Sequence, residues 1–196
     1  MSGAGSTAKL LCAEDGRELI RIARRSLREH LGAGGGPEAG GPPPSLAGSL
    51  AEPRGVFVTL TVGGKLRGCT GYVEGTRPVG EAVRELAVSS AARDPRFSPV
   101  ELAELDDLHI EVSVLTPPHP IDPAAVEVGK HGLIVRMSGR SGLLLPQVAP
   151  EWGWDAEELL ARTCEKAWVP RDSWKKPECV LLAFEAQIFE EEPPPT

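Results

Sequence analysis

The sequence lacks the spacings on which metal centres and disulfide frameworks depend. Its four cysteines include no C-x-x-C pair, and its four histidines form no H-x-H or H-x-x-x-H pair. Structural zinc sites and disulfide-rich domains are recognised by such spacings. We therefore expect neither a metal nor a cofactor, and a reducing compartment fits the chain best.

Signals for secretion and membrane insertion are also missing. The first residues, Met1 to Ser6, lack the charged-then-apolar layout of a secretory signal. No apolar run approaches the roughly 20 residues that span a bilayer. We expect a cytoplasmic protein with no membrane partner.

A basic excess is missing as well, because the formal net charge is −7 at pH 7. Proteins that coat nucleic acid gain their affinity by neutralising phosphates, so we expect no bulk nucleic-acid coating, although a local basic pocket stays open. Aromatic residues make up only 5% of the chain, so its core must rely on Leu, Val, Ala and Ile. A chain of 196 residues can bury such a core as one domain or two small lobes.

Hydrophobic periodicity predicts hairpins interleaved with helices. Helices are expected at 15–31, at 78–92 and from Asp155 onward. Strands are expected at 56–62, 66–73, 109–115, 132–137, 142–145 and 180–189. The pair Gly63-Gly64 favours a hairpin turn between the first two strands. This pattern indicates an α+β fold rather than a doubly wound parallel sheet.

Composition divides the chain into three parts. Residues 1–14 are an N-terminal segment, 15–189 form the domain, and 190–196 are expected to be a disordered acidic and Pro-rich tail. Within the domain, 32–55 is expected to be a flexible loop. Its part from Gly32 to Gly48 holds seven glycines and four prolines, which bury too little apolar surface to offset the entropy of ordering.

The most unusual segment is Arg67-Gly68-Cys69-Thr70-Gly71. Glycines on both sides leave the cysteine sulfur unshielded, with two amides available to a substrate oxygen. Arg67 is expected to favour the reactive thiolate. The alternative is a small buried cysteine in a bulged strand, and these residues alone favour neither.

Two other places in the chain offer polar companions. Glu111 and Ser113 share one face of their strand, where Glu111 can act as a base or both can belong to a solvated sheet face. Asp94 and Arg96 flank Pro95, so the turn presents a carboxylate and a guanidinium together. The alternative, which the sequence alone favours, is a plain turn that ends the helix and holds a local ion pair.

The remaining candidates are isolated. His131 enters a strand and is either structural or the base for a cysteine nucleophile. Gln147 follows Leu145-Pro146 and either orients a substrate carbonyl or caps backbone. Cys164 lies on the apolar stripe of its helix and is expected to be core.

The segment Leu66–Gly71 resembles the LRGC-x-G signature of the AMMECR domain family, and most closely its prokaryotic subgroup, AmmeMemoRadiSam system protein A. The resemblance spans about Val56 to Phe189. It continues through Ala91–Phe97, Ile110–Leu115, Gly142–Val148, Glu151–Trp154, Cys164–Ala167 and Trp174. The departures are Thr70, where isoleucine is commoner, and Trp168-Val169 in place of Gly-Leu.

The resemblance implies an α+β fold of two lobes, with antiparallel or mixed sheets, flanking helices and a cleft near the signature strand. It also implies genomic association with a Memo-like protein, a relative of ring-opening dioxygenases, and with a radical S-adenosylmethionine protein. Domain associations of the family suggest modification of a nucleobase or another small aromatic molecule.

Our leading hypothesis is a cysteine-dependent enzyme that acts on a small molecule or nucleobase. Cys69 would be the nucleophile or redox-active thiol, and Glu111 or His131 the proton-transfer group. The expected substrate shell is Arg67, Gly68, Gly71, Asp94, Arg96, Ser113 and Gln147. The alternative is a non-catalytic interaction or substrate-presenting module, and the acidic charge disfavours a third reading, a nucleic-acid adaptor.

Overall fold

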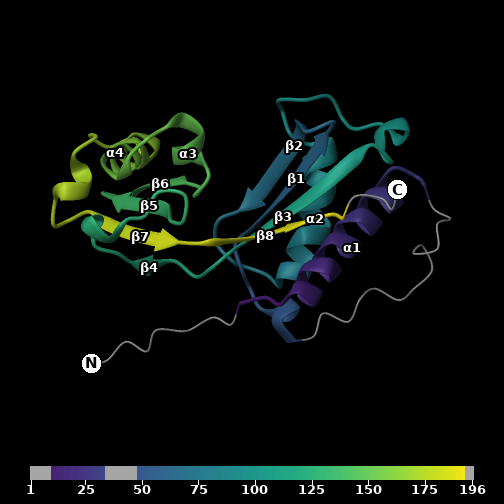
Figure 1. Cartoon of the computed structure of the whole chain (residues 1–196), viewed down its shortest axis with the longest axis horizontal. Helices are drawn as coiled ribbons and strands as arrows, with labels where there is room; N and C mark the ends of the chain where they lie inside the picture. The colour runs from purple at the N-terminus through teal and green to yellow at the C-terminus, as the bar shows by residue number, and fades with distance from the viewer. Residues whose placement is uncertain (1–9, 34–47, 193–196) are drawn as a thin grey trace. The chain divides into compact units, whose positions relative to one another are not determined.

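The chain forms two compact units, which we describe separately (Figure 1). The structure is a computed structural model that describes residues 10–33 and 48–192. The described residues up to Leu115 and from Gln187 onward form unit 1, and Thr116–Ala186 form unit 2. None of the helices in the described ranges is both long and apolar enough to cross a membrane.

Unit 1 contains a four-stranded sheet in the order β2-β1-β3-β8. Its strands are β1 (Val56–Val62), β2 (Lys65–Tyr72), β3 (Leu108–Leu115) and β8 (Ala186–Glu190). β1 pairs antiparallel with both β2 and β3. Gly63 and Gly64 adopt φ angles of 55° and 75°, the left-handed values that a tight hairpin turn requires, so the predicted β1–β2 hairpin is confirmed.

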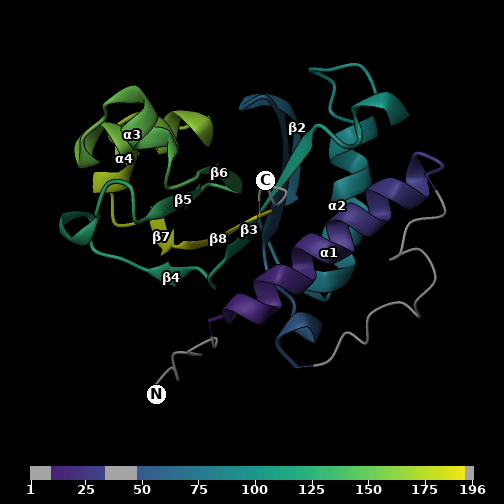
Figure 2. The ribbon, with the colours of Figure 1, turned by 45° about the vertical axis from the view of Figure 1, so that its right-hand side comes forward.

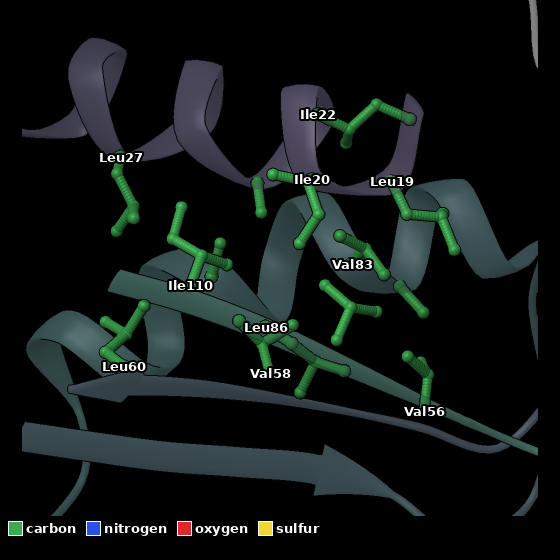
Figure 3. Close-up of a cluster of buried hydrophobic side chains, with 14 of the residues drawn as sticks. Leu19, Ile20, Ile22, Leu27, Val56, Val58, Leu60, Val83, Leu86 and Ile110 are labelled. Atoms are coloured by element: carbon green, nitrogen blue, oxygen red, sulfur yellow. The ribbon is translucent and has the colours of Figure 1, made fainter. Parts of the chain in front are cut away.

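Two helices, α1 (Ala13–His30) and α2 (Val79–Ala92), cover one face of this sheet (Figures 1 and 2). The alternation of β1 directs Val56, Val58 and Leu60 toward them, and all three are fully buried. Figure 3 shows these side chains meeting apolar side chains of α1, α2 and β3. The opposite face of the sheet therefore carries Thr59 of β1, Cys69 of β2, and Glu111 and Ser113 of β3.

Unit 2 contains a second four-stranded antiparallel sheet in the order β4-β7-β5-β6. Its strands are β4 (His119–Pro120), β5 (Gly132–Met137), β6 (Arg140–Leu144) and β7 (Val180–Phe184). Its helices are α3 (Val148–Trp152) and α4 (Ala156–Lys166). Asp155 caps α4 as predicted, because its carboxylate accepts the Glu158 N–H at 2.8 Å.

Short 3₁₀ helices complete the described structure. They are η1 (Gly48–Ala51), η2 (Leu102–Glu104), η3 (Pro123–Ala125) and η4 (Ser173–Lys175). The predicted α+β class is confirmed, with two antiparallel sheets and flanking helices. Among the strands and α-helices, β4 and α3 were not predicted, because a two-residue strand and a five-residue helix are too short to show a period.

The predicted boundaries need four corrections. The expected strand 180–189 is two strands, β7 and β8, which belong to different sheets. The expected flexible loop 32–55 is wrong over its last part, because η1 buries Leu50 in the unit 1 core. The domain begins before residue 15, since Leu11 is 5% exposed. The expected disordered tail begins too early, because Glu191 pairs with Arg24. Residues 1–9, 34–47 and 193–196 lie outside the described ranges.

Candidate functional site

Cys69 lies in the middle of β2, the edge strand of the unit 1 sheet, and its main-chain amide is already bound. The N–H of Cys69 donates to Asp94 Oδ2 at 2.9 Å. The next N–H, of Thr70, donates at 2.9 Å to the Ser90 hydroxyl, which donates in turn to the Val58 carbonyl at 2.8 Å. The expectation of two free amides beside the sulfur is therefore wrong. Asp94 satisfies a donor on an edge strand that would otherwise invite further strand pairing, and Ser90 bridges Thr70 to its cross-strand partner Val58.

The two glycines that flank Cys69 are required by packing. A Cβ on Gly68 would lie 2.0 Å from the Ser90 carbonyl oxygen, so α2 rests directly on β2 at this position. A Cβ on Gly71 would lie 2.2 Å from Cδ1 of the Phe57 ring, which occupies the space left there. Binding of a substrate at either glycine stays a prediction.

The Cys69 side chain is half-buried and meets a hydroxyl and a guanidinium. Thr59, its cross-strand partner, donates from Oγ1 to the Cys69 Sγ at 3.4 Å. Arg96 donates from Nη2 to the Cys69 carbonyl oxygen at 3.3 Å. The Asp94 carboxylate raises the pKa of Arg96 above its ordinary value, and Cys69 adds to the increase. Arg96 is thus a fixed positive charge beside the thiol.

Asp94 holds that guanidinium in place. Its carboxylate accepts from Arg96 Nη2 at 2.6 Å and from Arg96 Nε at 2.9 Å. The hydrogen bond from Arg96 lowers the pKa of Asp94 far below its usual range, and the Cys69 amide acts in the same direction. Asp94 therefore links the edge of β2 to Arg96, and the carboxylate and guanidinium predicted at the Pro95 turn do lie together.

Arg67 is directed away from this group. Its Nε and Nη2 donate to the two Glu104 carboxylate oxygens at 2.6 and 2.9 Å, and Nη1 donates to the Ser98 carbonyl at 2.8 Å. The bond from Arg67 lowers the pKa of Glu104. The guanidinium beside Cys69 is that of Arg96, whereas sequence reasoning had assigned this electrostatic role to Arg67.

Glu111 and Ser113 lie on the same sheet face as Cys69. The Ser113 hydroxyl donates to Glu111 Oε1 at 3.0 Å. Thr59 is the register partner of both Cys69 and Glu111, so these three residues form one row across β2, β1 and β3. Two strand spacings separate Cys69 from Glu111, or roughly 10 Å. Sequence reasoning missed Thr59, although its alternation in β1 and the Gly63-Gly64 turn together predict its place in the row.

His131 and Gln147 belong to unit 2. His131 uses Nδ1 to accept the Glu127 N–H at 3.0 Å, which fixes the ring locally. The Gln147 carbonyl accepts the Glu151 N–H at 3.2 Å at the start of α3. The contact of His131 matches its structural alternative, whereas the Gln147 side chain makes no capping hydrogen bond. Participation of either residue in one site with Cys69 stays a prediction.

The other candidate ligands are dispersed. Within residues 10–33 and 48–192, no three His, Cys, Asp or Glu side chains gather closely enough to hold a metal ion. Cys164 is fully buried in the unit 2 core, as predicted, and burial raises its pKa.

The family model named AMMECR1 matches residues 20–189, which run from within α1 to within β8 and include both units. The chain belongs to the AMMECR1 family. The Cys69 row and the Asp94–Arg96 pair are therefore features of an AMMECR1 domain.

Archaeal relatives share this AMMECR1 domain over nearly their whole length. A protein of Methanothermobacter thermautotrophicus is 48% identical over 93% of this chain and 97% of its own. A protein of Methanopyrus kandleri is 46% identical over 94% and 92%. The crystal structure of a Pyrococcus horikoshii protein, described as uncharacterised, is 46% identical and covers 91% of this chain and 92% of its own, with a TM-score of 0.77.

Proposed function

We propose that this protein is a cysteine-dependent enzyme that acts on a small molecule or a nucleobase, with Cys69 as the nucleophile or redox-active thiol. The observation that carries the proposal is that Cys69 contacts both a hydroxyl, through its sulfur, and a guanidinium, through its carbonyl oxygen. The Thr59 hydroxyl donates to Sγ at 3.4 Å, and Arg96 binds the carbonyl of the same residue. Reactive cysteines lie in partially exposed, electropositive surroundings of this kind.

Arg96 also supplies a place for an oxygen of the substrate. Its side chain is 54% exposed, although Asp94 holds it through Nε and Nη2. No acceptor for Nη1 lies within hydrogen-bond distance in the described residues. This N–H group can bind a carboxylate, phosphate or carbonyl oxygen while the rest of the guanidinium stays fixed.

Glu111 is the proposed proton-transfer group. Its distance from Cys69, with Thr59 between them, excludes direct proton exchange with the thiol. A substrate that lies across Thr59 would meet the sulfur at one end and the carboxylate at the other. Ser113 holds one carboxylate oxygen, and the other can exchange a proton with such a substrate. His131 is the alternative base.

The resemblance of the signature segments supports a more specific assignment. We propose that the chain belongs to the AmmeMemoRadiSam system protein A subgroup and works in the cytoplasm. Its partners would be a Memo-like relative of ring-opening dioxygenases and a radical S-adenosylmethionine protein. Co-purification of the tagged chain with either partner tests this assignment.

A second candidate function is a non-catalytic interaction module. It is favoured by two exposed apolar side chains of unit 1, Leu66 in β2, 42% exposed, and Leu102 in η2, 53% exposed. The Arg67–Glu104 pair joins the two segments that carry them. Such a surface suits a protein partner better than it suits a small substrate.

Thiol reactivity separates the two functions. The full chain is treated with iodoacetamide at neutral pH, and alkylation of each cysteine is followed by peptide mass spectrometry. Cys69 should react several-fold faster than Cys12, which is exposed and serves as the internal control. Equal or slower reaction of Cys69 would refute the enzyme proposal and favour the interaction module.

Matched variants identify the cause of the reactivity. Arg96→Gln and Thr59→Val should each slow the alkylation of Cys69, because they remove the charge and the hydroxyl donor. Arg67→Gln is the control, since its guanidinium binds Glu104 and should leave the rate unchanged. Circular dichroism of each variant checks that the fold is intact. A metabolite comparison between wild type and a Cys69→Ser strain then identifies the accumulated substrate.

A further inference from the structure

Trp168 occupies a place where neither packing nor backbone preference accounts for a tryptophan. It follows Ala167, the C-terminal cap of α4, and its φ angle is 58°. This left-handed conformation is usual for glycine after a helix and costly for a bulky side chain. The residue is nevertheless 83% exposed, so its indole gains little burial. Strain of this kind in an exposed aromatic residue points to a ligand.

A pocket of about 450 Å³ adjoins this indole, lined by Arg140, Ser141, Ala167 and Trp168. A tight turn at Ser138 and Gly139 places Arg140 at the start of β6, and Arg140 donates to the Trp168 carbonyl. A Cβ on Gly142 would lie 2.2 Å from the Ala167 nitrogen, so the end of α4 rests directly on β6. These contacts hold two distant segments against each other within unit 2.

The pocket carries positive charge that no neighbouring carboxylate neutralises. In the part of the chain that the structure describes, no Asp or Glu lies within ion-pair distance of Arg140, the charged residue of the lining. Two other exposed arginines of this unit, Arg162 and Arg171, differ from Arg140, because both pair with Glu158 and Glu165. The chain has a net charge of −7, so an exposed arginine with no carboxylate partner stands out from the rest of its surface. Such a positively charged pocket is suited to bind an anion.

We propose that this pocket binds a nucleotide, whose base stacks on Trp168 and whose phosphate binds Arg140 and the Ser141 hydroxyl. An indole offers the largest stacking surface of any side chain, and a guanidinium matches the geometry of phosphate oxygens. The volume lies in the range of small-molecule sites. The site lies in unit 2 and does not depend on the reaction at Cys69.

Titration of the full chain with adenosine 5′-monophosphate tests the site, with adenosine and inorganic phosphate as half-ligands. Calorimetry gives the Kd, and the indole N–H signals in a proton–nitrogen correlation spectrum report the location. The nucleotide should bind more tightly than either half-ligand and shift the Trp168 signal first. Trp168→Gly and Arg140→Gln should each weaken binding about tenfold. Trp168→Gly should fold, because glycine favours the local backbone conformation.

The same unit provides matched controls. Trp152 is 69% exposed and stacks on Trp154, over whose ring Arg162 lies. Trp152→Ala and Arg162→Gln remove an exposed indole and a guanidinium outside the pocket, so they should leave the Kd unchanged. The proposal is overturned if millimolar nucleotide does not bind, if a half-ligand binds as tightly, or if the control variants weaken binding as much as the pocket variants.

Discussion

Replacing Gly68 by alanine should separate α2 from the strand that carries Cys69. The new Cβ would lie 2.0 Å from the carbonyl oxygen of Ser90 and 3.0 Å from its carbonyl carbon. Both are backbone atoms of α2 and cannot rotate away. Ordinary contact begins near 3.4 Å, so the two segments must move apart by about 1.4 Å. The same movement stretches the hydrogen bonds of the Ser90 hydroxyl to Thr70 and Val58.

The expected loss of unfolding free energy is about 3 kcal/mol. Overpacking costs ~1–3 kcal/mol, and weakening the hydrogen bonds of Ser90 adds about 1 kcal/mol. Gly71→Ala is the matched control on the same strand. Its Cβ would meet the Phe57 ring at 2.2 Å, but this side chain can turn aside, so we expect a loss of about 1 kcal/mol. The change in chain entropy on replacing glycine is the same for both variants and cancels in the comparison.

Urea unfolding with two probes measures the effect. The two longest helices, α1 and α2, lie in unit 1 and dominate the far-ultraviolet circular dichroism. All four tryptophans lie between residues 116 and 186, so tryptophan fluorescence reports unit 2. Gly68→Ala should lower the midpoint seen by dichroism more than Gly71→Ala does. Equal midpoints for the two variants would refute the argument that α2 rests on β2 through Gly68.

Three further predictions concern titration and a helix end. The hydrogen bond to Glu85 raises the pKa of Tyr72 above its ordinary value. The stabilisation of the fold by this bond is therefore complete below about pH 10, and it is lost as the pH rises through the pKa of the folded state. Absorbance titration of this single tyrosine should give a lower pKa in Glu85→Gln; an unchanged pKa would contradict the bond. Arg96 lowers the pKa of Asp94. The contribution of this ion pair to the free energy of unfolding is therefore present above about pH 4 and is lost as the pH falls further. In Asp94→Asn the midpoint of thermal unfolding should fall less steeply as the pH is lowered below about 4. An unchanged slope would refute this prediction. Trp168→Gly should raise stability by about 1 kcal/mol in thermal unfolding, and a loss would contradict the strain at that residue.

Local pattern was sufficient for most elements of the fold. The alternation of β1, the Gly63-Gly64 turn and the Asp155 cap each depend on residues close in sequence, and all three predictions are confirmed. The break at Glu185 between β7 and β8 could not be predicted from the local sequence pattern. A run of apolar residues indicates a strand but does not show which sheet the strand joins.

The sequence indicated which residues of the candidate site are of interest, but not which of them contact one another. The local pair of Asp94 and Arg96 followed from the turn at Pro95. The partner of Arg67 is Glu104, 37 residues away, and only the packing of the folded chain brings them together. The charge beside Cys69 could therefore not be assigned to the correct arginine from the sequence.

The division between β7 and β8 has a consequence for the order in which the protein folds during synthesis. β8 lies beside β3, so Thr116–Ala186 is an insertion between two neighbouring strands of one sheet. Unit 2 has all its residues before β8 leaves the ribosome. Only then does Gln187 bind both the amide and the carbonyl of Leu11, 176 residues earlier. The unit whose synthesis starts first is thus the last to close, and its open β3 edge needs protection until translation reaches the C-terminal strand.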